Sequence, residues 1–260
     1  MKKNEFEARF SPEITEIAAV IAPSGCGAGR GGGETYWSVN AEITAWQHVE
    51  GGEVHVADCC RLTALVENTD ELREKLKANS VITAKVRKGG KDFLICEITE
   101  SGKSFPLLEQ VLEEQLKPVY YEDGVLGTFT LDKSINTYDG TVDWLGEEIS
   151  VSFNLDEEEN MRSSISLLRN LTANQKDWDV KARQFAASAL TDLANEWLQE
   201  EDEEEITEED FASRITLNEI TAETDGEFIF WFDDDDIFLG HSICVTGTIE
   251  NGFDDAEIAG

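Results

Sequence analysis

The sequence lacks the features that mark several classes of protein. No apolar run among its 260 residues is long enough to span a bilayer, and residues 1–10 contain no hydrophobic stretch typical of a signal peptide. The five cysteines are an odd number without the spacing of a disulfide framework, and no two of them form a C-x-x-C pair. We therefore expect a soluble cytoplasmic protein.

Basic residues are scarce in the second half of the chain. Residues 1–120 hold 14 lysines and arginines against 19 aspartates and glutamates, whereas residues 121–260 hold 7 against 36. Such an acidic surface repels nucleic acid and anionic membranes and attracts basic proteins or cations. Basic residues interleaved with aromatics, which are typical of a nucleic-acid surface, are missing from the same half. The charge therefore favours a basic protein partner, with solubility as the alternative role.

A change in composition near Pro118 coincides with the change in charge. We place a domain boundary there, which divides the chain into residues 1–118 and residues 119–260. Hydrophobic residues make up 40% of the sequence, enough for a core in each part.

The first domain is predicted to be small and β-rich, with one or two helices. Residues 80–87 alternate apolar and polar side chains, and residues 92–99 return as a hairpin partner after a Lys-Gly-Gly-Lys turn. Asn68, with Glu71 three residues later, marks the start of a helix. The other strands are predicted at residues 14–21, 36–49 and 53–66, and the helices at residues 70–78 and 107–116.

The second domain is predicted to be α+β, with an antiparallel sheet packed by helices. A three-stranded meander is expected around Phe129, Val142 and Val151, because apolar residues recur there with period two. Residues 228–232 read Phe-Ile-Phe-Trp-Phe, which predicts a strand buried on both faces or one whose second face meets a partner. The remaining elements are helices at residues 160–171 and 177–198, a short helix after a capping box at Thr207, and final strands at residues 227–232 and 242–249.

A glycine-rich stretch near the N-terminus contains a G-x-G-x-x-G pattern over residues 27–32. A dinucleotide site needs such glycines to end a strand and to open a helix. Here Thr35 to Val39 is strand-like instead, and no Gly-Lys-Ser/Thr follows. The stretch is therefore interpreted as a mobile loop between two strands.

Residues 240–244, Gly-His-Ser-Ile-Cys, resemble the G-x-S-x-G turn that carries a hydrolase nucleophile. Cys244 replaces the last glycine, the following residues are strand-like, and no histidine follows Ser242. No complete catalytic constellation is therefore present, which favours a non-enzymatic protein that uses no cofactor.

Acidic runs supply the candidate binding residues. For a basic partner these are Asp233, Asp234, Asp235, Asp236, Glu203, Glu204 and Glu205. The alternative is an enzyme or metal-dependent protein, in which Asp233, Asp235 and His241 hold an ion with oxygen and imidazole ligands. Consecutive aspartates point in different directions, however, and the run lacks EF-hand spacing, so a charged turn is the favoured interpretation.

Three segments carry a family resemblance: LGTFTLDKSINTYDGTVDWLGEEISVSF, DVKARQFAASALTDLANEWL and FLGHSICVTGTIENGFDDAEIAG. Over residues 118–260 the chain resembles the bacterial domain of unknown function 2262, and the likeness extends toward GCGAGR and EITAWQHV. The resemblance implies a bacterial cytoplasmic protein and a boundary near residue 118, and it assigns no catalytic residue. Our leading hypothesis is a non-enzymatic module whose acidic C-terminal domain binds a basic protein, for example as an inhibitor or immunity protein.

Overall fold

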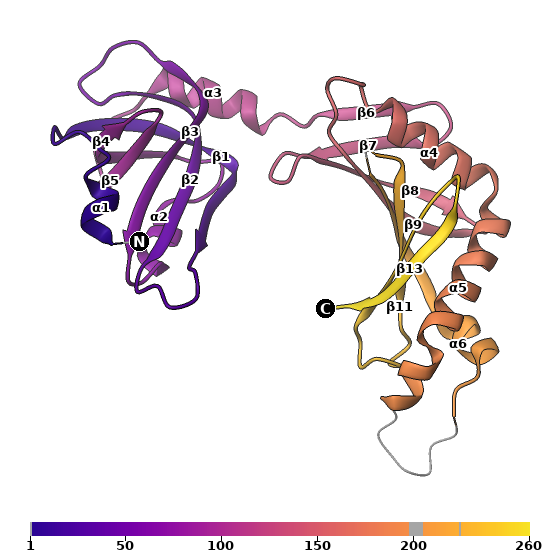
Figure 1. Cartoon of the computed structure of the whole chain (residues 1–260). Helices are drawn as coiled ribbons and strands as arrows, with labels where there is room; N and C mark the ends of the chain where they lie inside the picture. The colour runs from indigo at the N-terminus through magenta and orange to yellow at the C-terminus, as the bar shows by residue number, and fades with distance from the viewer. Residues whose placement is uncertain (1, 198–204, 224) are drawn as a thin grey trace. The chain divides into compact units, whose positions relative to one another are not determined.

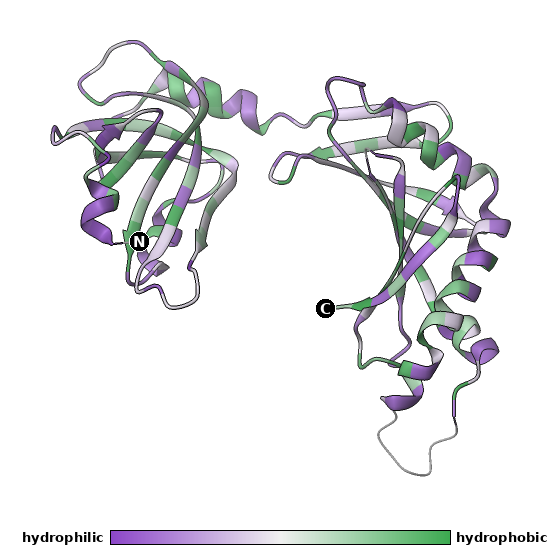
Figure 2. Ribbon diagram, viewed as in Figure 1, coloured by the Kyte–Doolittle hydropathy of each residue, from purple (hydrophilic) through white to green (hydrophobic). Residues whose placement is uncertain are grey.

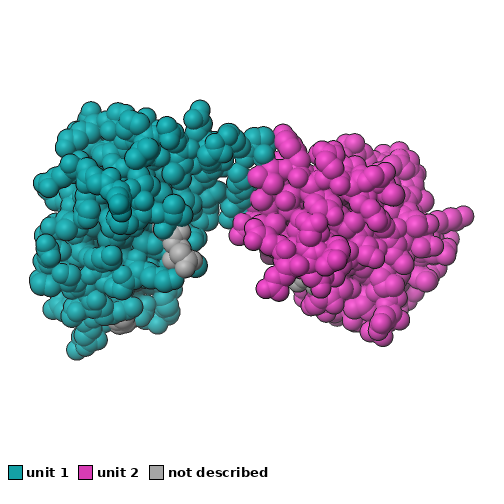
Figure 3. Space-filling model, turned by 90° about the horizontal axis from the view of Figure 1, so that it is seen from above, with its two compact units in different colours: residues 1–118, 133–135 teal, residues 119–132, 136–260 magenta. Residues whose placement is uncertain are grey.

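The computed structural model describes residues 2–197, 205–223 and 225–260. The chain forms two compact units, Met1–Pro118 with Lys133–Ile135 and Val119–Asp132 with Asn136–Gly260 (Figure 3). Both helices and strands are present, as an α+β fold requires, but the sheets are a closed five-stranded barrel and a large eight-stranded sheet. Within the described residues, no helix has both the length and the apolar character needed to cross a membrane.

Unit 1 is built on the barrel, whose strands follow the order β1-β2-β3-β5-β4 (Figure 1). All pairs are antiparallel except β3 with β5. The hairpin predicted over residues 80–99 is confirmed as β4 and β5. The elements of unit 1 are α1 (Lys3–Glu7), β1 (Thr15–Gly29), β2 (Trp37–His48), β3 (His55–Val66), α2 (Asp70–Lys75), β4 (Val81–Gly89), β5 (Asp92–Thr99) and α3 (Pro106–Leu116).

The glycine stretch is part of strand β1, so the prediction of a loop is wrong up to Gly29. The pairing of β1 with β2 shifts register between Ile21 and Cys26, which bends the strand as barrel closure requires. Gly25 has φ +66°, and a Cβ there would lie 3.2 Å from the Cβ of Ala78. The glycines therefore serve a sharp strand bend, and only residues 30–36 form the connection to β2.

Aliphatic side chains fill the barrel interior, and other segments cover parts of its outside. Phe105 and Leu108, at the start of α3, pack on Ala18 and Val20 of β1. At a separate place, Phe6 and Phe10 of the N-terminal segment pack with strand side chains. The interior residues include Ile17, Ile21, Val39, Ile43, Leu62, Ala84, Val86 and Phe93.

Unit 2 contains one sheet with the strand order β13-β12-β11-β10-β9-β8-β7-β6. Its β9–β10 pair is parallel and the other pairs are antiparallel, so the predicted antiparallel sheet is wrong at this seam. The sequence analysis missed β6, β10 and β13. The strands are β6 (Tyr120–Asp123), β7 (Gly127–Asp132), β8 (Thr137–Trp144), β9 (Glu147–Asn154), β10 (Thr216–Ala222), β11 (Glu227–Asp233), β12 (Ser242–Thr248) and β13 (Gly252–Ala259).

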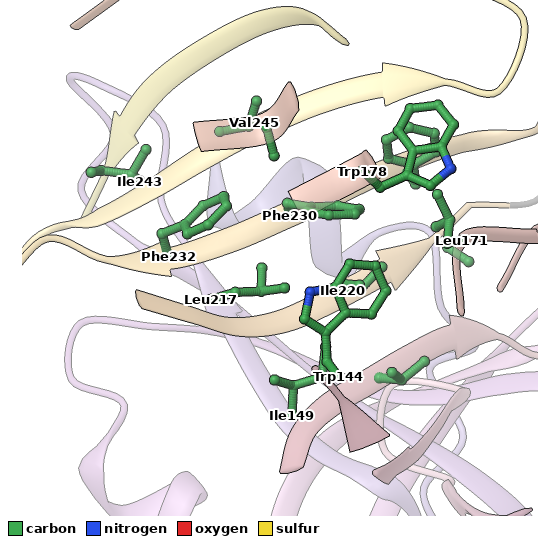
Figure 4. Close-up of a cluster of buried hydrophobic side chains, with 14 of the residues drawn as sticks. Trp144, Ile149, Leu171, Trp178, Leu217, Ile220, Phe230, Phe232, Ile243 and Val245 are labelled. Atoms are coloured by element: carbon green, nitrogen blue, oxygen red, sulfur yellow. The ribbon is translucent and has the colours of Figure 1, made fainter. Parts of the chain in front are cut away.

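Three helices, α4 (Arg162–Ala173), α5 (Gln175–Glu196) and α6 (Glu208–Arg214), cover one face of this sheet (Figure 1). Hydrophobic residues recur along α5 at helical spacing, with hydrophilic residues between them, which gives the helix one apolar side (Figure 2). The capping box at Thr207 is confirmed, while the predicted helix end at Leu198 lies outside the described residues. Figure 4 shows part of the resulting core, in which the Trp144 and Phe230 ring centroids are 5.6 Å apart.

Candidate functional site

The strand β11 shows how the two faces of the unit 2 sheet differ. Phe228, Phe230 and Phe232 are fully buried beneath the helices, whereas Ile229 and Trp231 point to the opposite face and are only half-buried. Since side chains alternate along a strand, this second face continues onto the neighbouring strands. Of the two alternatives for residues 228–232, burial on both faces is wrong, because one face is core and the other is only half-buried. The alternative that the second face meets a partner stays a prediction.

We call the face opposite the helices the open face and define it by two rows of register-paired side chains. The first row, from β8 to β13, is Asp139, Ser152, Thr221, Ile229, Thr246 and Asp255. The second row, over the same strands, is Thr141, Ser150, Glu219, Trp231, Cys244 and Glu257. The face is thus polar with a small apolar centre.

Every charge in the two rows is negative. In the described part of unit 2, no lysine or arginine lies on a strand, because the basic residues after residue 120 lie on the helices or in the turn that follows β7. Partial burial raises the pKa of Asp139, and the negative charges of Asp132 and Glu219 raise it further. The open face is therefore a surface of one sign of charge. The basic residues elsewhere are Lys133, Arg162, Arg169, Lys176, Lys181, Arg183 and Arg214.

Hydrogen bonds hold the centre of the open face in place. The Ser152 hydroxyl donates to Glu219 Oε1 at 2.7 Å and lies 3.1 Å from Thr221 Oγ1. The Trp231 indole Nε1–H donates to Thr221 Oγ1 at 3.1 Å. The two hydroxyl groups thus orient the central carboxylate, and the Thr221 hydroxyl also orients the central aromatic ring.

The four aspartates of the predicted run, residues 233–236, lie in different environments. Asp233 ends β11 opposite Ser242. Asp234 is buried and accepts hydrogen bonds from the backbone N–H groups of Asp236, Phe238 and Gly240. Its carboxylate therefore organises the loop and is not available to a partner.

The next residue, Asp235, forms an ion pair with Arg214 at 2.8 Å, which partly neutralises it. Asp236 is exposed, and so is Glu205. Glu203 and Glu204 lie outside the described residues.

The alternative metal site placed His241 with two of these aspartates. His241 Nδ1 lies 2.6 Å from the carbonyl oxygen of Phe238, and the ring packs edge-on against Trp197 with centroids 5.6 Å apart. In the described residues, no group of three His, Cys, Asp or Glu side chains is arranged to hold a metal ion. The histidine thus has local packing and hydrogen-bond partners of its own.

Burial also affects the thiols. Burial raises the pKa of Cys60 to about 11, helped by the negative charge of Asp92, and its Sγ donates to the Lys91 carbonyl at 2.7 Å. On the open face, burial likewise raises the pKa of Cys244. Because the thiolate is the reactive form, both shifts disfavour a nucleophilic role for these cysteines.

The sequence analysis did not find the open face, although part of its signal is visible. Asp139, Thr141 and Asp143 alternate with buried residues along β8, which marks a polar face. The face becomes a site only when strands distant in sequence are placed side by side, and this depends on the parallel pairing of β9 with β10.

The chain belongs to a family of uncharacterized proteins conserved in bacteria (DUF2262), whose model matches residues 123–258, just over half of the chain. The family inferred from the three segments is thereby confirmed. Residues 2–115 match a second family model, a domain of unknown function (DUF7021). No curated protein and no solved structure matches the chain.

Proposed function

We propose that the protein is a non-enzymatic binding module whose open face engages a basic protein. The observation that carries this proposal is the segregation of charge in unit 2, where the carboxylates of the two rows have no cation among them. A surface of one sign attracts partners of the opposite sign and speeds their encounter.

The hydroxyl groups and half-buried apolar side chains of the open face support the same function. An interface needs groups that hydrogen-bond and an apolar centre that excludes water, with charge around it. The Ser152 and Thr221 hydroxyl groups supply the hydrogen-bonding groups, and the neighbouring Ile229 and Trp231 supply the apolar centre. A protein that covers a basic surface in this way acts as an inhibitor or immunity protein does, without chemistry of its own.

Two triple variants with the same change in charge test the proposal. The first neutralises the open face with Asp139→Asn, Asp255→Asn and Glu257→Gln. The second neutralises exposed acids on α5 with Asp177→Asn, Asp192→Asn and Glu196→Gln. The probe is an oligolysine peptide, and its affinity is measured by calorimetry at low and at high salt.

We expect the open-face variant to bind oligolysine at least roughly tenfold more weakly at low salt, and the α5 variant to lose less than about threefold. High salt should weaken wild-type binding and reduce the difference between the two variants. Equal losses in both variants would mean that the peptide responds to overall charge, and the proposal would then fail.

A further inference from the structure

The side chain of Trp231 is held on the open face with its indole N–H already satisfied. The Nε1–H donates to Thr221 Oγ1 at 3.1 Å, and the ring is half-buried on the face opposite the helices. An indole held in this way can present its aromatic face to a ligand, because its N–H group already has a hydrogen-bond partner.

Glutamates flank this tryptophan along its own row of the sheet. Glu219 is the direct register partner of Trp231 on β10. On the other side, Cys244 pairs with Trp231 and Glu257 pairs with Cys244. Ser152 orients one of these carboxylates by its 2.7 Å hydrogen bond to Glu219 Oε1. Trp231 therefore has one glutamate on the adjacent strand and a second glutamate two strands away on its other side.

Three of the other five tryptophans of the chain have a cation from the chain itself. Arg30 lies 4.6 Å from the ring centroid of Trp37, Lys88 lies 5.5 Å from that of Trp46, and Lys181 lies 5.2 Å from that of Trp178. Among the described residues, no lysine or arginine lies over Trp231. Its position over the charged sheet thus leaves room for a cation that another molecule supplies.

We infer that Trp231, Glu219 and Glu257 form a subsite for an arginine side chain of the basic partner. The inference rests on the proposed function and specifies its chemistry. A guanidinium group is planar, so it stacks on an indole while its N–H groups donate to carboxylates at its edge. The ammonium group of lysine is a compact, strongly hydrated charge and gains less from a flat ring.

The test compares oligoarginine and oligolysine peptides of equal length on the full chain. Wild-type protein should bind oligoarginine roughly fivefold more tightly, because only the guanidinium gains the stacking contact. Trp231→Leu should bring the ratio of the two affinities to about one and leave oligolysine affinity nearly unchanged. Tyr120→Leu removes an exposed aromatic ring from β6 and serves as the matched control, for which the ratio should persist.

A second pair of variants keeps the test valid if Trp231→Leu fails to fold, which circular dichroism would reveal. Glu257→Gln should lower oligoarginine affinity at least twofold more than Asp254→Asn, which removes an exposed charge from the same strand. No arginine preference in the wild type, or a preference that survives Trp231→Leu, would overturn the subsite. If the subsite fails, a loss of oligolysine affinity in the open-face triple variant would still support the proposed function. The failure of the subsite and the failure of the proposed function are therefore distinguishable.

Discussion

Asp123 and Asp139 lie in the same sheet and have opposite electrostatic environments. Burial alone would raise the pKa of Asp123, but hydrogen bonds from Arg169 and from the N–H groups of Leu126 and Val125 outweigh it, and its pKa is lowered. On the open face, burial and neighbouring carboxylates raise the pKa of Asp139. The helix-covered face pairs the Asp123 carboxylate with Arg169, whereas the open face leaves carboxylates to repel one another.

The closed barrel of unit 1 differs from the open sheet of unit 2 in having no unpaired edge among its described strands. A closed barrel has no sheet edge and buries its inner face in one core, as the interior of unit 1 does. The open sheet of unit 2 keeps two edges and one face free of its own helices. Like charges on that face repel a second copy of the same surface, so its acidity also opposes face-to-face self-association.

The largest expected effect is the difference in stability between substitutions on the two faces of strand β11. Phe230→Ala removes a ring that is fully buried and lies 5.3 Å from the Phe253 centroid, so unit 2 should lose about 3–5 kcal/mol of unfolding free energy. Ile229→Ala, on the open face, should cost only about 1 kcal/mol. Urea unfolding followed by circular dichroism measures both. Equal losses would show that the open face is packed as tightly as the core.

A smaller loss of stability is expected when the Asp123 carboxylate, which is paired with Arg169, is removed. Asp123→Asn leaves four N–H groups, those of Val125 and Leu126 and two of Arg169, without their charged acceptor, and we expect a loss of about 2 kcal/mol at neutral pH. Because the folded pKa lies below its ordinary value of 3.8, the stabilisation is present above that pH and is lost as pH falls through the folded pKa. Stability curves of wild type and variant should therefore begin to approach each other below about pH 4 and meet only below the folded pKa. A constant difference would contradict the assigned role.

The smallest effect has the opposite sign. Asp139→Asn removes a charge that the open face disfavours, so it should stabilise unit 2 by about 0.5 kcal/mol at neutral pH and low salt. The folded pKa lies above 3.8, so the cost of the charge appears as pH rises through it and is absent when the group is protonated. Thermal melting at several pH values and salt concentrations measures this. Destabilisation at neutral pH would show that Asp139 has a favourable partner.

Local patterns in the sequence predicted the elements that pack on a core. The capping box at Thr207, the amphipathic α5 and the continuously apolar strand β11 all follow from residue types within a short window. Strands β10 and β13 were missed because polar and acidic residues occupy much of their length, which weakens the apolar alternation. The open face was missed for a related reason, since its rows join strands that are far apart in the sequence.

The parallel pairing of β9 with β10 has a consequence for how unit 2 folds. It joins two meanders, β6–β9 and β10–β13, whose internal contacts are between neighbours in sequence. The seam itself requires closing the long segment that carries α4, α5 and α6, and closure of a long segment costs chain entropy before any contact compensates for it. We therefore expect each meander to form early and the seam that unites them, and with it the continuous open face, to form last.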